Sequence, residues 1–294
     1  MRQAMLVCTS RVGHAYVLLS TLLSMVVALT ILFMLLAYSW DAIYQQGFNL
    51  FSSKWHPADG QFGIISMVYG SAMVTMVALI IVVPLGLATA LFISEVLPPR
   101  HRFRVKSALE LLAGIPSIVY GLIGVAFFSV WVGNWFTLST GRTILTAAIL
   151  LAIMILPTLI TLSDDALHSV PRKYRETARG LGLYRHEVIL NCVLPLAKAD
   201  ILGAVLLSLG RALGETMAVM LVIGSIDKIP QPFFNLLTPG QTVTSKLGRE
   251  IAEAVFGSLH FSALIFMGLI LLLIVMVLTG ISQYYTKLAP RLYE

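Results

Sequence analysis

The chain has 294 residues, of which 58% are hydrophobic and only 12% are charged, whereas about 25% of the residues in an ordinary soluble domain are charged. This composition argues against a soluble protein and indicates an integral membrane protein. The net charge of +6 does not indicate nucleic acid binding, because the basic residues lie between apolar segments instead of on a soluble basic face. With only Cys8 and Cys192 present there is no disulfide framework, and we interpret both cysteines as inert.

Six apolar segments are long enough to cross about 30 Å of hydrocarbon as helices. The first is too long for the apolar part of a signal peptide, and no small-residue cleavage motif follows it. The second segment is broken by Pro84 and is long enough to tilt or kink, while Pro116 lies near the start of the third segment and Pro157 near the end of the fourth. The sequence therefore predicts an all-α integral membrane protein with six transmembrane helices, over residues 15–38, 64–94, 111–136, 143–163, 201–224 and 259–282.

The distribution of Lys and Arg predicts how these spans are oriented. An even number of spans places both termini on one side. The tails 1–14 and 283–294 and the loops 95–110 and 164–200 together hold fourteen Lys and Arg residues, against five on the other side. Because cytoplasmic segments carry the excess of basic residues, we predict that both termini and both loops are cytoplasmic. Residues 64–282 then form the transmembrane core of a single domain.

Two segments on the opposite side, residues 39–63 and 225–258, are long enough to fold. In the second, four apolar residues recur every fourth position, which predicts a short amphipathic helix over residues 242–257. This helix would lie against the membrane surface or a partner, or it would cover the mouth of the helix bundle. The sequence leaves both alternatives open.

No motif for catalysis is present: the chain lacks a phosphate-binding G-x-x-x-x-G-K-[ST], an H-E-x-x-H and a G-x-S-x-G sequence. The acidic pair Asp164-Asp165, with His168 one turn further, lies at the cytoplasmic exit of a span. A solvated helix start explains this pair better than catalysis does. We therefore predict that the chain is not an enzyme and that it holds no metal and no cofactor of its own.

The 164–200 loop predicts two short helices joined by a turn. Pro171 suits the first turn of a helix, where its missing N–H costs nothing, and Tyr174, Ala178 and Leu181 would then share one face. Gly180 and Gly182 would end this helix, and a second helix over 184–191 would run to Pro195. A compact basic element of this kind is either a docking site for a partner or a solvated loop.

The fifth span is the one that carries charges. Ser208, Arg211 and Glu215, with Asp200 before them, fall within about 80° of one another at 100° per residue. A charged side chain within a span costs roughly 2.5–3.5 kcal/mol and marks a functional candidate. We therefore predict that Ser208, Arg211 and Glu215 line a substrate pathway. The alternative is that Arg211 and Glu215, one turn apart, only neutralise each other.

The loop motif also carries a resemblance. Glu176-Thr177-Ala178, followed by Gly182 and then by Leu194-Pro195, resembles the E-A-A-x-x-x-G-x9-I-x-L-P loop of ABC import permeases. Thr177 stands where the first alanine of the motif is usual, and Cys192 where isoleucine is usual. The resemblance implies that these six residues dock the chain into a cleft on an ATPase subunit.

Two further strings resemble a narrower family, the PstC-type permease subunits of bacterial phosphate ABC importers: residues 210–219 (GRALGETMAV) and 110–121 (ELLAGIPSIVYG). The resemblance runs from about residue 64 to the C-terminus. It implies a type I ABC importer permease fold in the bacterial inner membrane. It also implies a sister permease (PstA-like), two copies of a cytoplasmic ATPase (PstB-like) that carries ATP and Mg²⁺, and an external phosphate-binding protein (PstS-like).

Three alternatives remain at this point. Another oxyanion, such as sulfate or molybdate, would use the same kind of pathway. A secondary transporter or channel working without ATP would explain the buried charges but would leave the 164–200 loop unexplained. A membrane enzyme would need acid, base or metal-ligating residues that converge at one membrane face, and the sequence offers none.

Overall fold

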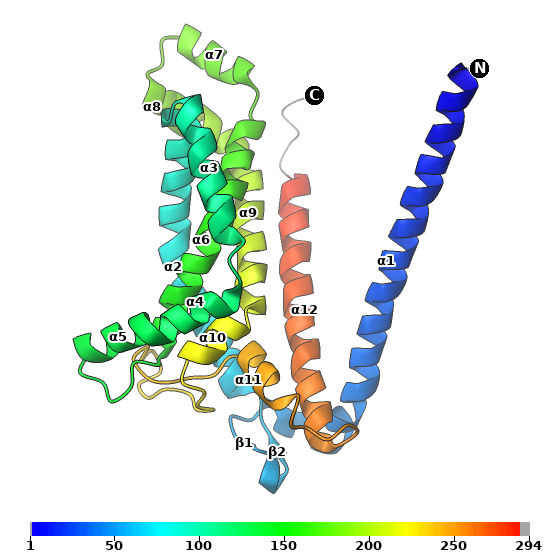
Figure 1. The fold of residues 1–294 in the computed structure, drawn as a ribbon, viewed down its shortest axis with the longest axis vertical. Helices are drawn as coiled ribbons and strands as arrows, with labels where there is room; N and C mark the ends of the chain where they lie inside the picture. The colour runs from blue at the N-terminus through cyan, green and yellow to red at the C-terminus, as the bar shows by residue number, and fades with distance from the viewer. Residues whose placement is uncertain (1, 289–294) are drawn as a thin grey trace.

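The computed structural model describes residues 2–288, so Met1 and the predicted tail from residue 289 onward lie outside it. Helices make up most of it (Figure 1). Six helical stretches in this part are long and apolar enough to cross a membrane, which confirms the six predicted spans. Their bounds are Ala15–Phe51, Ile65–Val96, Ser117–Trp135, Ile144–Ser169, Arg185–Gly214 and Leu259–Ile281.

The N-terminal part begins with one long helix, α1 (Arg2–Gln46), which extends the predicted first span at both ends. A short 3₁₀ turn, η1 (Gly47–Phe51), leads into a two-stranded antiparallel hairpin in which Trp55 pairs with Phe62. Its strands are β1 (Trp55–His56) and β2 (Gln61–Phe62), joined by the 3₁₀ turn η2 (Pro57–Asp59). The second span is α2 (Ile65–Leu91), which passes through Pro84 and ends in a π-helical turn, η3 (Phe92–Val96).

The third span starts later than predicted. Helix α3 (Pro99–Ala113) ends before Gly114, and a new helix begins only after Pro116. Gly114 ends α3 and Pro116, in an extended conformation, stands directly before the first turn of α4, whereas Pro84 and Pro157 lie inside α2 and α6. The span therefore consists of α4 (Ser117–Ile123), a π-helical segment η4 (Gly124–Phe128) and α5 (Ser129–Trp135). It runs across the direction of α3 (Figure 1).

The remaining elements complete the bundle. Helix α6 (Ile144–Ser169) is followed by α7 (Arg172–Gly180), α8 (Arg185–Val188) and a third π-helical segment, η5 (Ile189–Val193). The fifth span is α9 (Leu194–Gly214), which a break separates from α10 (Met217–Val222). Then follow α11 (Val243–Glu250) and the last span, α12 (Leu259–Leu288).

Helix α6 is the centre of the core. Its apolar side chains Ile144, Leu151, Ile155 and Leu159 are almost fully buried between α2, α9 and α10. Two-thirds of its apolar window is buried, against none for α1. Helix α1 packs chiefly against α12 (Figure 1), so we expect its exposed Leu, Val and Phe side chains to contact lipid.

The molecule has two ends. The end with α7, α8 and the start of α3 also holds the first turns of α1 and the last turns of α12 (Figure 1); we call it the α7 end. The opposite end holds the β1–β2 hairpin, α10 and α11, and we call it the hairpin end. The first turns of α1 and the last turns of α12 thus lie at the same end, as an even number of spans requires.

Helix α11 is shorter than the predicted helix over residues 242–257. It ends at Glu250, after which the chain turns, and Val255 is 73% exposed. Its buried residues include Thr244, Ser245 and Lys246, so polar contacts fix it as much as apolar ones do. Because α11 packs against α2, α10 and α12, it closes the hairpin end of the bundle, which is the second of the two alternatives.

The segment before α11 lies directly on α2. A β-carbon added to Gly70 of α2 would lie 2.0 Å from the backbone carbonyl oxygen of Gln241. Only glycine permits this approach. Ser71 reinforces it, because its hydroxyl accepts a hydrogen bond of 2.9 Å from the backbone N–H of Val243.

Candidate functional site

The fifth span breaks where the sequence predicted a continuous helix over 201–224. Helix α9 ends at Gly214, Glu215 is extended (φ −70°, ψ 124°), and α10 starts at Met217. Nearby side chains form hydrogen bonds with some of the backbone groups that the break leaves unpaired. The Glu215 carboxylate accepts a hydrogen bond from the N–H of Ala218 (3.2 Å), as a helix-capping side chain does. The Thr244 hydroxyl donates to the carbonyl oxygen of Glu215 (2.8 Å).

Arg211 has a neutral partner. Its guanidinium donates a hydrogen bond of 2.8 Å to the Thr158 hydroxyl on α6. Arg211 and Glu215 form no ion pair in the part of the chain that the structure describes, since Glu215 is turned toward α10. The mutual neutralisation that the sequence left open is therefore not what this structure contains. Arg211 is also exposed on the surface of this chain.

The depth of Arg211 within the helix bundle follows from the position of Thr158 along α6. Thr158 lies about 21 Å from the start of α6 and about 17 Å from its end, at 1.5 Å per residue. The guanidinium that contacts it is therefore close to the middle of the most deeply packed span. Thr158 was not among the predicted site residues, because its role depends on the packing of α6 against α9. The sequence feature that could have identified it is a hydroxyl side chain directly after Pro157 in an otherwise apolar span.

Ser208 lies apart from Arg211. It is fully buried on the same face of α9 as Ala204 and Ala212, and its hydroxyl has no hydrogen-bond partner among the residues that the structure describes. The predicted stripe is thus divided: Ser208 faces the core, whereas Arg211 is exposed. Asp200 lies near the α7 end, where the Ser169 hydroxyl donates to it (3.3 Å).

The 164–200 loop folds as a helix, a turn and a second helix. In α7, Ala178 is buried, while Glu176 and Thr177 are exposed. Leu181 is 76% exposed and does not share the buried face predicted for it, because α7 ends at Gly180. Gly182 has φ +86°, which L side chains rarely adopt, and apart from its two chain neighbours none of the described residues has an atom within 4 Å of where its β-carbon would be. Backbone conformation rather than crowding therefore requires glycine there.

The second helix of the loop does not stop before Pro195. It continues from α8 through η5 into α9, with Leu194 and Pro195 in the first turn of α9. In a regular α-helix the ring of Pro195 would clash with the carbonyl group four residues earlier. The wider π-helical turn immediately before it accommodates the ring. Cys192 is half-buried in this turn and weakly contacts the carbonyl of Tyr174 (3.8 Å), while the side chain of Cys8 lies outside those described.

The acidic pair at the end of α6 is not a solvated helix start. Asp164 is 2% exposed, and both of its oxygens lie 2.9 Å from a guanidinium nitrogen of Arg102 on α3. Asp165 is exposed and pairs with Lys106 at 2.7 Å. His168 contacts Arg102 and the Ser94 hydroxyl. The expectation of solvation was wrong, because a basic helix distant in sequence packs against this turn.

A buried lysine, absent from the predicted set, lies at the hairpin end. Lys246 of α11 is 1% exposed, and its Nζ lies 2.5 Å from Asp227 and 2.6 Å from Glu250. Glu250 also accepts hydrogen bonds from Trp55 and contacts His260, each at 3.1 Å. Burial alone would raise the pKa of the Glu250 carboxyl, but hydrogen bonding and charge from Lys246, with hydrogen bonds from His260 and Trp55, hold it below its usual value.

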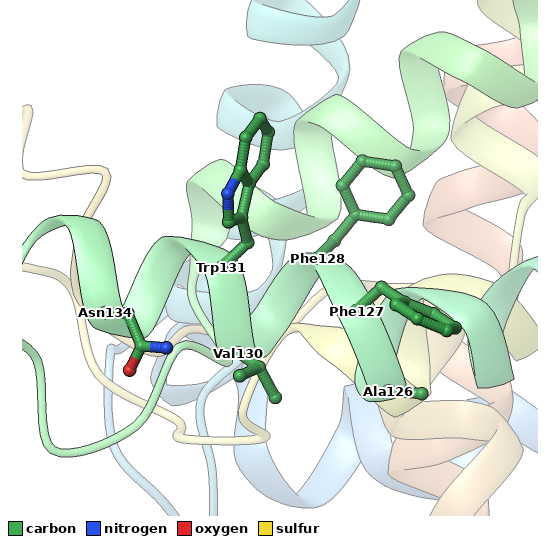
Figure 2. Close-up of a pocket in the computed structure, with 6 residues that line it drawn as sticks. All are labelled: Ala126, Phe127, Phe128, Val130, Trp131 and Asn134. Atoms are coloured by element: carbon green, nitrogen blue, oxygen red, sulfur yellow. The ribbon is translucent and has the colours of Figure 1, made fainter.

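Two hollows lie away from Arg211. Figure 2 shows the rings of Phe128 and Trp131 on one side of the third span, beside a cavity of about 380 Å³. Its lining is mostly apolar, which suits lipid or a partner helix. A polar groove of about 1480 Å³ at the hairpin end lies between residues 53–61 and 225–239. No group of three His, Cys, Asp or Glu side chains that could hold a metal occurs among the described residues.

With this geometry in place, comparison with known proteins identifies the class. Residues 83–288 match the family of binding-protein-dependent transport system inner membrane components. The chain belongs to this family. It is a multi-pass inner membrane protein and a transport component rather than a catalytic enzyme. The match leaves out α1, the hairpin and the first two-thirds of α2.

Comparison with individual relatives gives a more specific result. The chain is 35% identical to the phosphate transport system permease protein PstC of Mesorhizobium japonicum, over 94% of this chain and 89% of that protein. It is 37% identical to PstC of Pasteurella multocida, over 83% of this chain and 81% of that protein. Among solved structures, the MetNI methionine ABC transporter matches with a TM-score of 0.61 at 15% identity, covering 78% of this chain and 96% of that one. A bacterial alginate ABC importer matches with a TM-score of 0.55 at 16% identity, covering 83% and 87%. The predicted type I ABC importer permease fold is thereby confirmed.

Proposed function

We propose that the chain is the PstC-type permease subunit of an ATP-driven phosphate importer and that it forms half of the translocation pathway. The observation that carries this proposal is the 35% identity to a phosphate permease over 94% of the chain. The partners are a PstA-like sister permease, two PstB-like ATPases with ATP and Mg²⁺, and a PstS-like phosphate-binding protein. The α7 end and both termini face the cytoplasm in this proposal.

The pathway residue with the strongest physical support is Arg211. A phosphate that loses hydration inside the membrane needs a fixed cation, and a guanidinium offers a bidentate fork that suits its oxygens. Thr158 orients Arg211 without cancelling its charge. Glu215 lies at the helix break, four residues after Arg211, and its negative charge would limit how tightly the anion is held. Ser208, one turn from Arg211, has a buried hydroxyl without a partner, and it stays a candidate for the same pathway.

The 164–200 loop is the proposed docking element for the ATPase. Its outward surface combines Glu176 and Thr177 with the exposed apolar side chains of Leu181, Tyr184 and Leu190. Exposed apolar side chains beside charges are typical of interaction surfaces. Ala178, Gly182, Leu194 and Pro195 support this surface, because they set the packing of α7, the turn after it and the entry into α9.

The experiment is uptake by the complete complex in liposomes. Arg211→Gln should abolish ATP-dependent phosphate uptake while the complex stays intact, and Arg142→Gln, which removes an exposed cation elsewhere, should not. Arg211→Lys should rescue only in part, because a point charge replaces a fork. Near-normal uptake by Arg211→Gln/Glu215→Gln would refute the pathway role. Uptake of sulfate or molybdate in preference to phosphate, or uptake without ATP, would refute the proposed function.

A further inference from the structure

One cation of α7 differs from its neighbours. Arg172, Lys173 and Arg179 are exposed and are free to meet a partner. The side chain of Arg175, in the middle of the same helix, is only 14% exposed. It is turned toward the membrane helices, away from the proposed docking surface.

Arg175 joins three segments. Its Nε and Nη2 donate to one carboxylate oxygen of Glu95, at 3.2 and 2.9 Å. Nη2 also donates to the carbonyl oxygen of Leu167 (2.7 Å), and Nη1 to that of Val170 (2.5 Å). Glu95 itself is 8% exposed. The guanidinium therefore connects α7 with the π-helical turn that follows α2, with the last turn of α6 and with Val170, which caps the end of α6.

Both attachment points lead into the core. Leu167 is nine residues from Thr158, so about 14 Å of continuous helix separates the carbonyl that Arg175 holds from the hydroxyl that orients Arg211. On the other side, Glu95 lies in the π-helical turn η3, whose N–H groups bond to the fifth residue before them, as Leu97 does to Phe92 (3.0 Å). Such turns are often found at functional positions. A displacement of α7 that moves Arg175 must therefore move the ends of α2 and α6, or break this set of bonds.

We infer that Arg175 is a positioning residue that transmits movement of α7 to α2 and α6 through Glu95 and the carbonyl group of Leu167. This inference rests on the proposed function, because it assumes that an ATPase moves α7. Arg175 touches neither the substrate nor the docking surface. Its contribution is to make α7 and the two spans move as one unit.

Glu95→Gln is the principal variant, because it leaves the sequence of the docking loop unchanged and keeps the side-chain volume. The complete complex in liposomes is assayed for phosphate taken up per ATP hydrolysed. We expect this ratio to fall at least tenfold, while the ATPase still co-purifies and hydrolysis without binding protein stays within about twofold of wild type. Arg104→Gln, which removes an exposed cation from α3 at the same end, is the matched control and should leave the ratio unchanged.

Two more variants test whether the pair acts together. Arg175→Gln/Glu95→Gln should be no worse than the more damaging single variant, since both remove the same connection. Arg175→Lys keeps the charge but cannot reach all of the acceptors, so it should restore the ratio in part. A role in stability alone would change the amount of complex and would leave the ratio intact.

Three results would overturn the inference: an unchanged ratio in Glu95→Gln, loss of the ATPase from that complex, or a double variant whose defect is the product of the single defects. Failure of the proposed function is recognised separately. In that case the wild-type complex would couple ATP hydrolysis to no phosphate uptake, whereas failure of the inference alone leaves wild-type coupling normal beside an equally coupled Glu95→Gln.

Discussion

Replacing Lys246 by methionine tests whether the buried ionic cluster holds the hairpin end together. The ammonium is 1% exposed and lies within 2.6 Å of carboxylate oxygens from both Asp227 and Glu250. Its removal leaves two largely buried carboxylates facing each other, and one oxygen of Asp227 already has no hydrogen-bond partner. Breaking a buried pair by removing one partner costs about 3–5 kcal/mol.

This cost is measurable as a loss of thermal stability. For a chain of this size, about 3–5 kcal/mol lowers the unfolding temperature by on the order of 10 °C. The assay is unfolding of the purified protein in detergent, followed by the fluorescence of Trp55, which lies 5.1 Å from the ammonium. Lys228→Met removes an exposed lysine from the preceding loop and should shift the midpoint by less than about 2 °C, because exposed charges contribute little.

The triple variant Lys246→Met/Asp227→Asn/Glu250→Gln separates the effect of leaving the two carboxylates unpaired from the effect of losing the contacts of Lys246. It removes the orphaned carboxylates as well, so it should regain much of the stability that Lys246→Met alone loses. The reasoning would be wrong if Lys246→Met were as stable as Lys228→Met, or if the triple variant were less stable than the single one.

Three further predictions concern single positions. Because the pKa of Glu250 is lower in the folded state than its usual value, its stabilising effect is complete at neutral pH and is lost as the pH falls through that lowered pKa. The difference in unfolding temperature between wild type and Glu250→Gln should therefore shrink below about pH 4, and a constant difference would contradict this. Gly182→Ala forces an L side chain into φ +86°, at a cost of about 1–2 kcal/mol. It should weaken ATPase co-purification without changing bundle unfolding, while Gly180→Ala, in open space without positive φ, should do neither. Gly70→Ala places a methyl group 2.0 Å from the Gln241 carbonyl and should destabilise by at least about 1–3 kcal/mol. Gly280→Ala, with open space around it, is its control in the same unfolding assay, and equal midpoints would refute the close contact.

Local signals predicted the spans well, because each depends on its own hydrophobic length. They failed where a helix is interrupted or ends early. Pro116 was visible in the sequence, but nothing local showed that α3 would end before it and pack on α6. The break after Gly214 was not predicted, because the contacts that satisfy it come from Thr244 on a distant helix. Local periodicity likewise extended α11 beyond Glu250.

The same distinction applies to the candidate site. Arg211 stood out because a charge within an apolar span is conspicuous in any single sequence. Thr158, Arg175 and Lys246 did not, since each becomes significant only through a partner far along the chain. The burial of Asp164 was missed for the same reason: its cation, Arg102, belongs to α3.

The lipid-facing surface of α1 has a consequence for how this chain drifts over evolutionary time. In a bilayer, one apolar side chain facing lipid serves nearly as well as another, provided that the total apolar length still matches the membrane thickness. Substitutions along α1 should therefore accumulate almost neutrally, while those in α6, packed on every side, are removed by selection. Among homologues, α1 should retain its hydrophobicity while its individual residues vary more than those of α6.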